Sequence, residues 1–182
     1  LGIDVTEVID GAATKPFAFL PHYPGAGVGG HCIPVDPYYL IEHAQTKGFE
    51  HKFLKLAREI NKSLPQYTVE RLQQALGQTT DHSTTLQGLP VALLGLAYKR
   101  DVGDVRESPA LEIEKILRAK GALVSTFDPF VPERSTAQTR ADALRSAVAV
   151  VLATDHTEFR NLTPEHLAGT TVRVLGDGRN CL

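Results

Sequence analysis

The residues best suited to chemistry lie in one stretch, residues 24–37, where glycines lead into a cysteine and an aspartate. Four glycines stand within six positions of this stretch: Gly25, Gly27, Gly29 and Gly30. Glycine allows the backbone to approach a ligand closely and to adopt positive φ angles. A thiol that follows such a loop, here Cys32, is placed to attack a ligand that the loop holds. Asp36 stands four residues further on, and we predict that it shares the site.

Plainer interpretations of these residues remain open. Free cysteine is among the residue types most often buried as inert core filler, and stretches rich in glycine and proline are often simple loops. Asp36 precedes Pro37, a pairing that is common in turns. The other cysteine, Cys181, lies beside the last residue and has no comparable neighbours. The density of special residues around Cys32 therefore favours that thiol as the nucleophile.

Apolar periodicity predicts helices around this stretch. Residues 1–13 are predicted to be the end of a helix, residues 14–37 the active loop, and residues 38–47 helical. Residues 51–76 follow a long helical pattern, in which Pro65 is expected either to kink the helix or to cost it a hydrogen bond. Glu59 and Asn61 on that helix are interpreted as solvated surface. The polar residues 77–88 then predict a loop and a domain boundary.

Beyond residue 88 the pattern changes to short apolar strands that alternate with helices. Ser108 is a good N-cap and Pro109 a good first residue for one helix, and residues 136–145 predict another. Continuous apolar strands with helices between them are typical of a parallel sheet covered on both faces. The predicted strands are residues 90–95, 123–127, 147–153 and 171–175.

Two charged residues stand where such a sheet binds ligands. Lys99 and Arg106 follow the first strand, and open parallel sheets bind ligands beyond the carboxyl ends of their strands. Cationic side chains there suit a diphosphate. The plainer interpretation is that Lys99 and Arg106 form surface ion pairs. Gly95 stands alone, so the segment is no dinucleotide fingerprint. Arg100, Lys115, Arg118 and Lys120 are interpreted as ordinary solvated charges.

Three segments of the chain together resemble the UDP-glucose/GDP-mannose dehydrogenase family. They are residues 14–17 with 23–40, residues 95–110 and residues 177–180, and their order and spacing fit over the whole chain. The Gly29-Gly30-His31-Cys32 form resembles the branch that oxidises UDP-N-acetylhexosamines. The resemblance implies a helical central segment that forms a homodimer through the long helix, followed by a Rossmann-like UDP-binding domain. The corresponding boundaries are residues 1–77 and 88–182.

The resemblance also implies roles for individual residues. Cys32 would add to an aldehyde intermediate as a thiohemiacetal that is oxidised to a thioester, and Asp36 would act on the hydrolytic water. His31 is interpreted as a packing or sugar-contacting residue. Arg106 would reach the NAD pyrophosphate. The residues implied in UDP-sugar binding are Tyr23, Gly25, Gly27, Gly29, Gly30, Lys99, Arg179 and, less directly, Lys15, which stands near the place where relatives reach the neighbouring subunit's sugar.

Composition narrows the class of protein further. The 182 residues are 42% hydrophobic with a net charge of −2, which supports a globular core and gives no reason to expect nucleic acid or an anionic membrane as partner. No apolar run reaches the roughly 20 residues of a membrane span. Two cysteines predict no disulfide framework, so a reduced cytoplasmic setting is expected. We expect no metal site.

Three functions fit the sequence to different degrees. The first is the C-terminal part of an NAD-dependent UDP-N-acetylhexosamine 6-dehydrogenase, with UDP-glucose as the alternative substrate. No Gly-x-Gly-x-x-Gly unit follows a strand, so we expect a nicotinamide-binding domain upstream and no activity from this segment alone. The second is a UDP-binding and dimerisation module. A cysteine acyl-transfer enzyme fits least, because no histidine base is evident.

Overall fold

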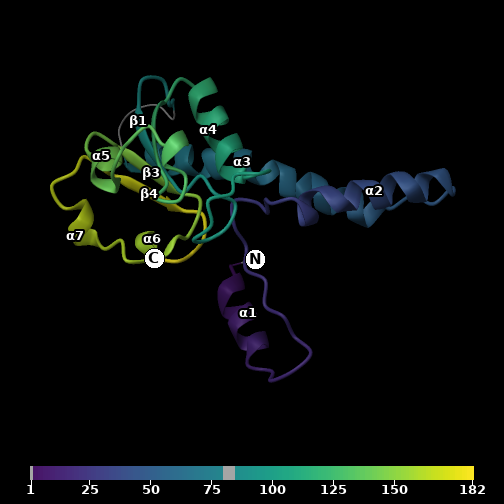
Figure 1. Cartoon of the computed structure of the whole chain (residues 1–182). Coiled ribbons are helices and arrows are strands. Elements are labelled where there is room, and N and C mark those ends of the chain that lie inside the picture. The colour runs from purple at the N-terminus through teal and green to yellow at the C-terminus, as the bar shows by residue number, and fades with distance from the viewer. Residues whose placement is uncertain (1, 80–84) are drawn as a thin grey trace.

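The computed structural model describes residues 2–79 and 85–182. An α/β body carries a projecting arm of helices (Figure 1). The helices of the N-terminal part are α1 (Val5–Ala13), α2 (Cys32–Thr46) and α3 (Lys52–Thr79). The body contains strands β1 (Pro90–Leu94), β2 (Leu123–Phe127), β3 (Ala149–Leu152) and β4 (Val174–Asp177). Its helical segments are α4 (Pro109–Ala119), η1 (Pro132–Arg134), α5 (Arg140–Leu144), α6 (Thr157–Arg160) and α7 (Pro164–Leu167).

The strands form one parallel sheet in the order β2-β1-β3-β4, as the apolar pattern predicts. Alternate residues of each strand point to opposite faces, and both faces are covered. Val69, Leu72 and Leu76 of α3 pack with α4 on one face. Helices α5 and α6 supply Leu144 and Phe159 to the other face. Because the carboxyl ends of all the strands meet at one edge, the segments that follow β1, β2, β3 and β4 converge there.

The first and last turns of α4 confirm the predicted helix signals. The Ser108 hydroxyl accepts the Ala110 N–H at 3.3 Å, and Pro109 occupies the first turn, where its missing N–H costs nothing. Ile113 and Leu117 are fully buried against the sheet. The helix predicted at residues 136–145 is shorter in the structure, where α5 begins at Arg140.

One expectation for the helical arm is wrong, and one is met in part. Residues 32–37 form the first turns of α2 rather than a loop. Pro34 is compatible with that turn because the first N–H groups of a helix have no partner within it. Pro65 lies inside α3, which runs without a break through all 28 residues. Since Pro65 has no N–H, the Asn61 carbonyl lacks its usual partner four residues on.

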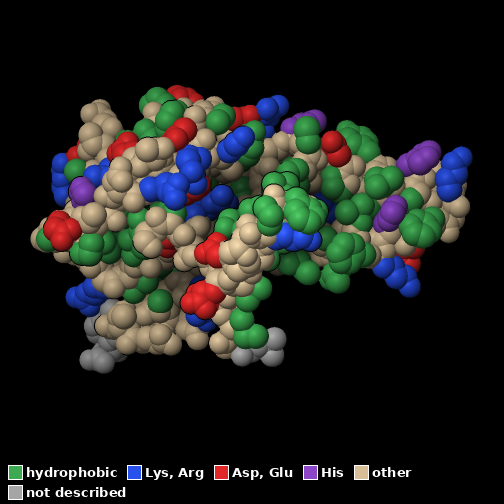
Figure 2. Space-filling model, turned by 90° about the horizontal axis from the view of Figure 1, so that it is seen from below, with side chains coloured by type: hydrophobic (Ala, Val, Ile, Leu, Met, Phe, Trp, Pro, Cys, Tyr) green, Lys and Arg blue, Asp and Glu red, His purple; other side chains and the backbone are tan. Residues whose placement is uncertain are grey.

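The apolar stripe at the beginning of α3 is uncovered. Phe53, Leu56 and Ile60 are 84%, 53% and 54% exposed, whereas the buried side chains of α3 begin at Pro65. Hydrophobic side chains cover much of the arm on the face shown in Figure 2. The first half of the helix is therefore no part of this chain's own core. None of the helices in the described part of the chain is both long and apolar enough to cross a lipid bilayer.

Candidate functional site

Cys32 is the first residue of α2, and its side chain is exposed at the beginning of the helix. Asp36 is also exposed and lies four residues later in the same helix. Residues spaced by four share one face of a helix, one turn apart. The structure therefore brings these two predicted residues onto one helical face. His31, the residue before the helix, makes no side-chain capping bond.

The loop that leads to Cys32 packs tightly on the segment between β1 and α4. The Gly30 N–H donates to the Arg106 carbonyl at 2.9 Å. Gly30 has φ +89°, and a Cβ there would lie 2.9 Å from the Tyr98 ring. A Cβ on Gly29 would lie 2.6 Å from the Glu107 carbonyl oxygen. Glycine is thus required at both positions by close approach to a second segment of the chain.

Asn61 holds the same loop from the other side. Its side-chain oxygen accepts the Val28 N–H at 2.8 Å, and its amide donates to the Val28 carbonyl at 3.2 Å. A Cβ on Gly27, whose φ is +127°, would lie 3.0 Å from the Pro109 ring. The interpretation of Asn61 as solvated surface is therefore wrong, because it forms a two-point clamp on the backbone just before Cys32.

Arg106 lies between this loop and solvent. Its side chain is 65% exposed and donates two hydrogen bonds to Asp104 Oδ2, from Nη2 at 2.6 Å and from Nε at 2.9 Å. The hydrogen bonds from Arg106 lower the pKa of the Asp104 carboxyl. The same pairing raises the pKa of the guanidinium, and the nearby Cys32 adds a smaller effect in that direction. The Arg106 backbone lies next to Gly30, two residues before Cys32.

A cleft of about 830 Å³ lies at the carboxyl edge of β3 and β4 and reaches the glycine loop. Its walls include the predicted residues Tyr23, Gly25 and Arg179. Tyr23 donates its hydroxyl proton to Asp10 at 2.7 Å, and this bond raises the pKa of Tyr23. A Cβ on Gly25 would lie 2.8 Å from Nη1 of Arg179, so the loop and the end of the sheet touch there.

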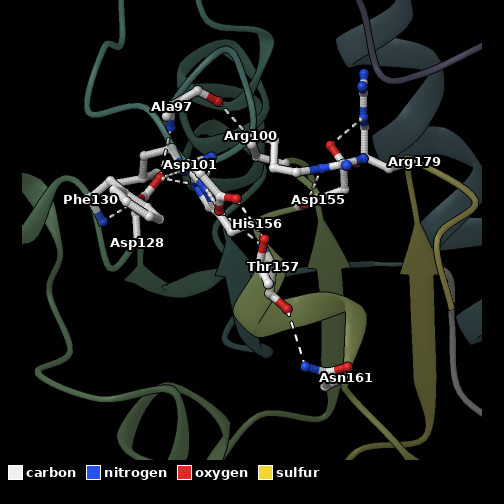
Figure 3. Close-up of polar contacts among 12 residues, drawn as sticks. Ala97, Arg100, Asp101, Asp128, Phe130, Asp155, His156, Thr157, Asn161 and Arg179 are labelled. Atoms are coloured by element: carbon white, nitrogen blue, oxygen red, sulfur yellow. Dashed lines mark hydrogen bonds and ion pairs between the residues drawn. The ribbon is translucent and has the colours of Figure 1, made fainter.

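Asp155 joins two arginines in the wall of this cleft (Figure 3). Its side chain is 6% exposed, and Arg100 Nε donates to Oδ2 at 2.9 Å. Arg179 Nε lies 3.3 Å from Oδ1. Burial raises the pKa of Asp155, but the Arg100 hydrogen bond and the Arg179 charge outweigh it, so the pKa is lowered overall. The interpretation of Arg100 as an ordinary solvated charge is therefore wrong.

The remaining predicted residues lie apart from the cleft. Lys99 is exposed in the turn after β1, and Lys15 lies over the Phe17 ring, with Nζ 5.0 Å from its centroid. Cys32 is outside the walls of the cleft. On the face seen in Figure 2, Lys and Arg side chains gather over the α/β body. The site thus has two neighbouring parts, the Cys32 helix with Arg106 and the arginine-lined cleft, which the glycine loop connects.

Sequence reasoning missed Asn61, Tyr98, Asp128, Asp155 and His156. Asp128 directly follows β2, Asp155 and His156 lie in the segment after β3, and Tyr98 lies beside Lys99 after β1, so the strand-end rule that singled out Lys99 would also have found these four. Asn61 had no such signal, because its partner lies far away in the sequence.

The fold is a mixed α/β architecture with a Rossmann-like parallel sheet. The chain belongs to the UDP-glucose/GDP-mannose dehydrogenase family: its central-domain model matches residues 1–63 and its UDP-binding-domain model residues 92–182. A UDP-N-acetyl-D-mannosamine dehydrogenase of Pyrococcus horikoshii is 37% identical over all of this chain and 41% of the relative. A UDP-N-acetyl-D-glucosamine 6-dehydrogenase of Pseudomonas aeruginosa is 32% identical over all of this chain and 42% of the relative.

A solved structure shares the fold. The UDP-D-ManNAc dehydrogenase of Pyrococcus horikoshii aligns with a TM-score of 0.87 at 36% identity, over 100% of this chain and 41% of that one. The chain therefore spans about two-fifths of the length of these relatives.

Proposed function

We propose that this chain is part of an NAD-dependent 6-dehydrogenase that oxidises a UDP-N-acetylhexosamine to the uronic acid. The observation that carries the proposal is the packing of Gly29 and Gly30 on residues 98–107, which places the beginning of the Cys32 helix next to the segment that carries Arg106. The printed names of the relatives from Pyrococcus horikoshii and Pseudomonas aeruginosa support an amino sugar as substrate.

In this proposal Cys32 is the nucleophile. Its Sγ adds to the carbon of the intermediate aldehyde, and the carbonyl oxygen takes a proton, which gives a thiohemiacetal. Loss of a hydride from that carbon, together with loss of the hydroxyl proton, gives a thioester. Asp36, one turn further along α2, accepts a proton from water, which attacks the thioester carbon. The C–S bond then breaks, which releases the acid and regenerates the thiol.

Arg106 fits the pyrophosphate of NAD. Its guanidinium is largely exposed and is oriented by the hydrogen bonds to Asp104, and its backbone lies next to Gly30, two residues before Cys32. A planar guanidinium held in this way suits a phosphate group. NAD supplies the hydride acceptor when it is bound. The role of Arg106 is to place the cofactor next to the carbon that Cys32 holds.

The arginine-lined cleft fits the UDP part of the substrate. Arg100 and Arg179 present two guanidinium groups on Asp155, and Arg179 also lies against Gly25. Paired cations and exposed backbone N–H groups are what a diphosphate requires. Tyr23 forms part of the same wall. Lys99, in the turn next to Arg100, is assigned to the nucleotide-sugar, and Lys15 to the sugar of a neighbouring subunit.

The uncovered stripe of α3 supports a homodimer. Phe53, Leu56 and Ile60 recur along one face of the helix and are each more than half exposed. Apolar residues that recur on one face usually meet another protein surface, and a second copy supplies the same stripe. We also propose that residues 1–77 and 88–182 act as central and UDP-binding domains.

The first experiment is to express the complete reading frame and measure NADH formation. UDP-N-acetylmannosamine, UDP-N-acetylglucosamine and UDP-glucose are supplied in separate assays. About two NADH per amino sugar, with little from UDP-glucose, is the expected result, because an alcohol loses two hydrides to become an acid. Dominant turnover of UDP-glucose would instead assign the alternative substrate. Bound UDP with no NADH from any sugar would leave a nucleotide-binding module.

A further inference from the structure

Two titratable side chains outside the proposed site, Asp128 and His156, are fully buried, both 0% exposed. Asp128 follows β2, and His156 precedes α6 (Figure 3). Their side chains bond at 3.0 Å, between Asp128 Oδ2 and His156 Nε2. Neither residue touches the cleft wall, and the proposed reaction uses neither. Burying ionisable groups is costly unless they are well bonded, so their partners indicate what they do.

Asp128 hydrogen-bonds the backbone at the beginning of the turn that follows β1. Its Oδ2 accepts the N–H of Leu96 at 2.6 Å and the N–H of Ala97 at 2.8 Å. Its Oδ1 accepts the N–H of Phe130 at 2.8 Å. Burial raises the pKa of Asp128, but the His156 hydrogen bond and these N–H groups lower it by more, so the carboxylate stays ionised.

His156 hydrogen-bonds the backbone at the end of the same turn. Its Nδ1 accepts the Asp101 N–H at 2.8 Å, so Nδ1 carries no proton and Nε2–H donates to Asp128. The imidazole therefore has one tautomer, with both nitrogens in use. Phe130 lies at 4.9 Å and Phe159 at 5.5 Å between ring centroids, and both restrict its orientation.

Asp101 needs this support. Its φ is +54°, a conformation that non-glycine residues adopt at a cost. Thr157, next to His156, donates its hydroxyl to Asp101 Oδ2 at 2.6 Å and its N–H to Oδ1 at 3.0 Å. The backbone on one side of the turn is thus held by Asp128 and the backbone on the other side by His156, while Thr157 holds the Asp101 side chain.

Tyr98, Lys99 and Arg100 lie between Ala97, which Asp128 holds, and Asp101, which His156 holds. Arg100 reaches Asp155 in the cleft wall. Tyr98 packs on Gly30, two residues before Cys32. One short turn therefore carries groups that face both parts of the proposed site.

We propose that Asp128 and His156 are positioning residues that fix the 97–101 turn, and thereby set Lys99 and Arg100 for binding of the nucleoside diphosphate. The inference rests on the proposed function for its ligand, but the grip on the turn is independent of it. The pair acts through backbone bonds alone and does not contact the substrate.

Two variants of one residue separate positioning from simple filling of the core. His156→Asn places an acceptor oxygen near the Nδ1 position and keeps a partner for the Asp101 N–H. His156→Gln extends to the Nε2 position, where it serves Asp128 and leaves the Asp101 N–H without an acceptor. Both variants lose the aromatic packing. Amide hydrogen exchange in the 182-residue chain, UDP affinity by calorimetry and Tm are measured for each.

His156→Gln is expected to raise exchange at the Asp101 amide and to weaken UDP binding by about tenfold, the effect of one buried N–H left unbonded. His156→Asn is expected to have nearly native exchange at the Asp101 amide and nearly native UDP affinity, although its Tm also falls. Equal losses of UDP affinity in the two variants, in step with Tm, would overturn the proposal. So would an Asp101 amide that stays protected in His156→Gln.

If the His156→Gln chain fails to fold, Asp128→Asn tests the same proposal. Asp128→Asn presents an amide where the Leu96 and Ala97 N–H groups need an oxygen, and faster exchange at both amides with weaker UDP binding is expected. Unchanged exchange there contradicts the proposal. A native chain that binds no UDP would refute the proposed function, while the exchange pattern still decides whether the pair holds the turn.

Discussion

At the scale of single residues, the site depends on where backbone comes close to backbone. Gly29 and Gly30 allow the loop before Cys32 to lie against Tyr98 and the Glu107 carbonyl. Asn61 fixes that loop from α3 with two hydrogen bonds. The position of the thiol is therefore set by neighbours that do no chemistry themselves.

Replacement of the nucleophile tests the proposed chemistry directly. In the complete enzyme, Cys32→Ser is expected to reduce formation of the uronic acid by at least about a hundredfold, because serine is a poorer nucleophile and a poorer leaving group. UDP affinity should be unchanged, since Cys32 lies outside the cleft wall. The matched control is Cys181→Ser, which changes the other thiol, in the cleft wall, and should retain turnover at saturating UDP-sugar. Native turnover in Cys32→Ser would refute the thioester mechanism.

Close approach at Gly30 has a measurable effect on stability. Gly30→Ala introduces a Cβ at a φ of +89° and within 2.9 Å of the Tyr98 ring. Gly48 has a similar φ of +77° but nothing within 4 Å, so Gly48→Ala measures the backbone strain alone. Gly30→Ala is expected to lower the free energy of unfolding by about 1–3 kcal/mol more than Gly48→Ala in urea titrations. Equal losses would contradict the packing described here.

At the scale of elements, the site is a meeting of strand ends. The segments after β1, β3 and β4 supply Arg100, Asp155 and Arg179, whose charges are joined by the buried carboxylate. The segment after β2 supplies Asp128, which accepts the N–H groups of Leu96 and Ala97 and so holds the turn after β1. A parallel sheet makes this possible because its strands all end at one edge.

The buried carboxylate of Asp155 predicts a pH dependence. Its pKa is lowered in the folded chain, so its contribution to the free energy of unfolding is present above the unfolded value of about 4 and is lost as the pH falls through the folded value. Asp155→Asn is expected to be less stable than the native chain by about 1–3 kcal/mol at pH 7, because Arg100 and Arg179 lose their partner.

Urea unfolding between pH 3 and 7 measures this effect, and the gap between the two chains should close toward acid. Asp142→Asn, which removes a surface pair with Arg145, is the matched control and should cost less than about 1 kcal/mol at any pH. A gap between Asp155→Asn and the native chain that stays constant with pH would count against the role given to that carboxylate.

The predictable parts of the fold are those with a local signal. The buried strands are continuous apolar runs, and Ser108 with Pro109 marks a helix start in any context. The beginning of α2 was not predictable in this way, because Pro34 suggests a loop although the first helical turn tolerates it. Asn61 and His156 act on backbone 33 and 55 residues away, so only the folded chain brings them to their partners.

At the scale of the whole molecule, the arm and the body differ in how their apolar residues are used. The second half of α3 is buried in the core of the body, whereas its first half presents an uncovered stripe. The same helix therefore belongs to the sheet at one end and is open to a partner at the other.

Substitution in the stripe tests the proposed homodimer. Phe53→Ser is expected to weaken self-association by at least about tenfold in sedimentation equilibrium, because a large aromatic at an interface often supplies 1.4 kcal/mol or more. Leu123→Ser, at an exposed apolar residue of β2, is the control and should leave self-association unchanged. A monomeric native protein, or equal effects of the two changes, would contradict the stripe as the interface.

The unbroken course of α3 has a consequence for communication between subunits. At 1.5 Å per residue its 28 residues form a rod of about 42 Å. Asn61, which clamps the loop before Cys32, lies between the stripe and the buried half of this rod. In the proposed homodimer, a rotation or tilt of this rod on association would also displace that clamp. Assembly would then be mechanically coupled to the position of the Cys32 thiol, without a separate signalling element.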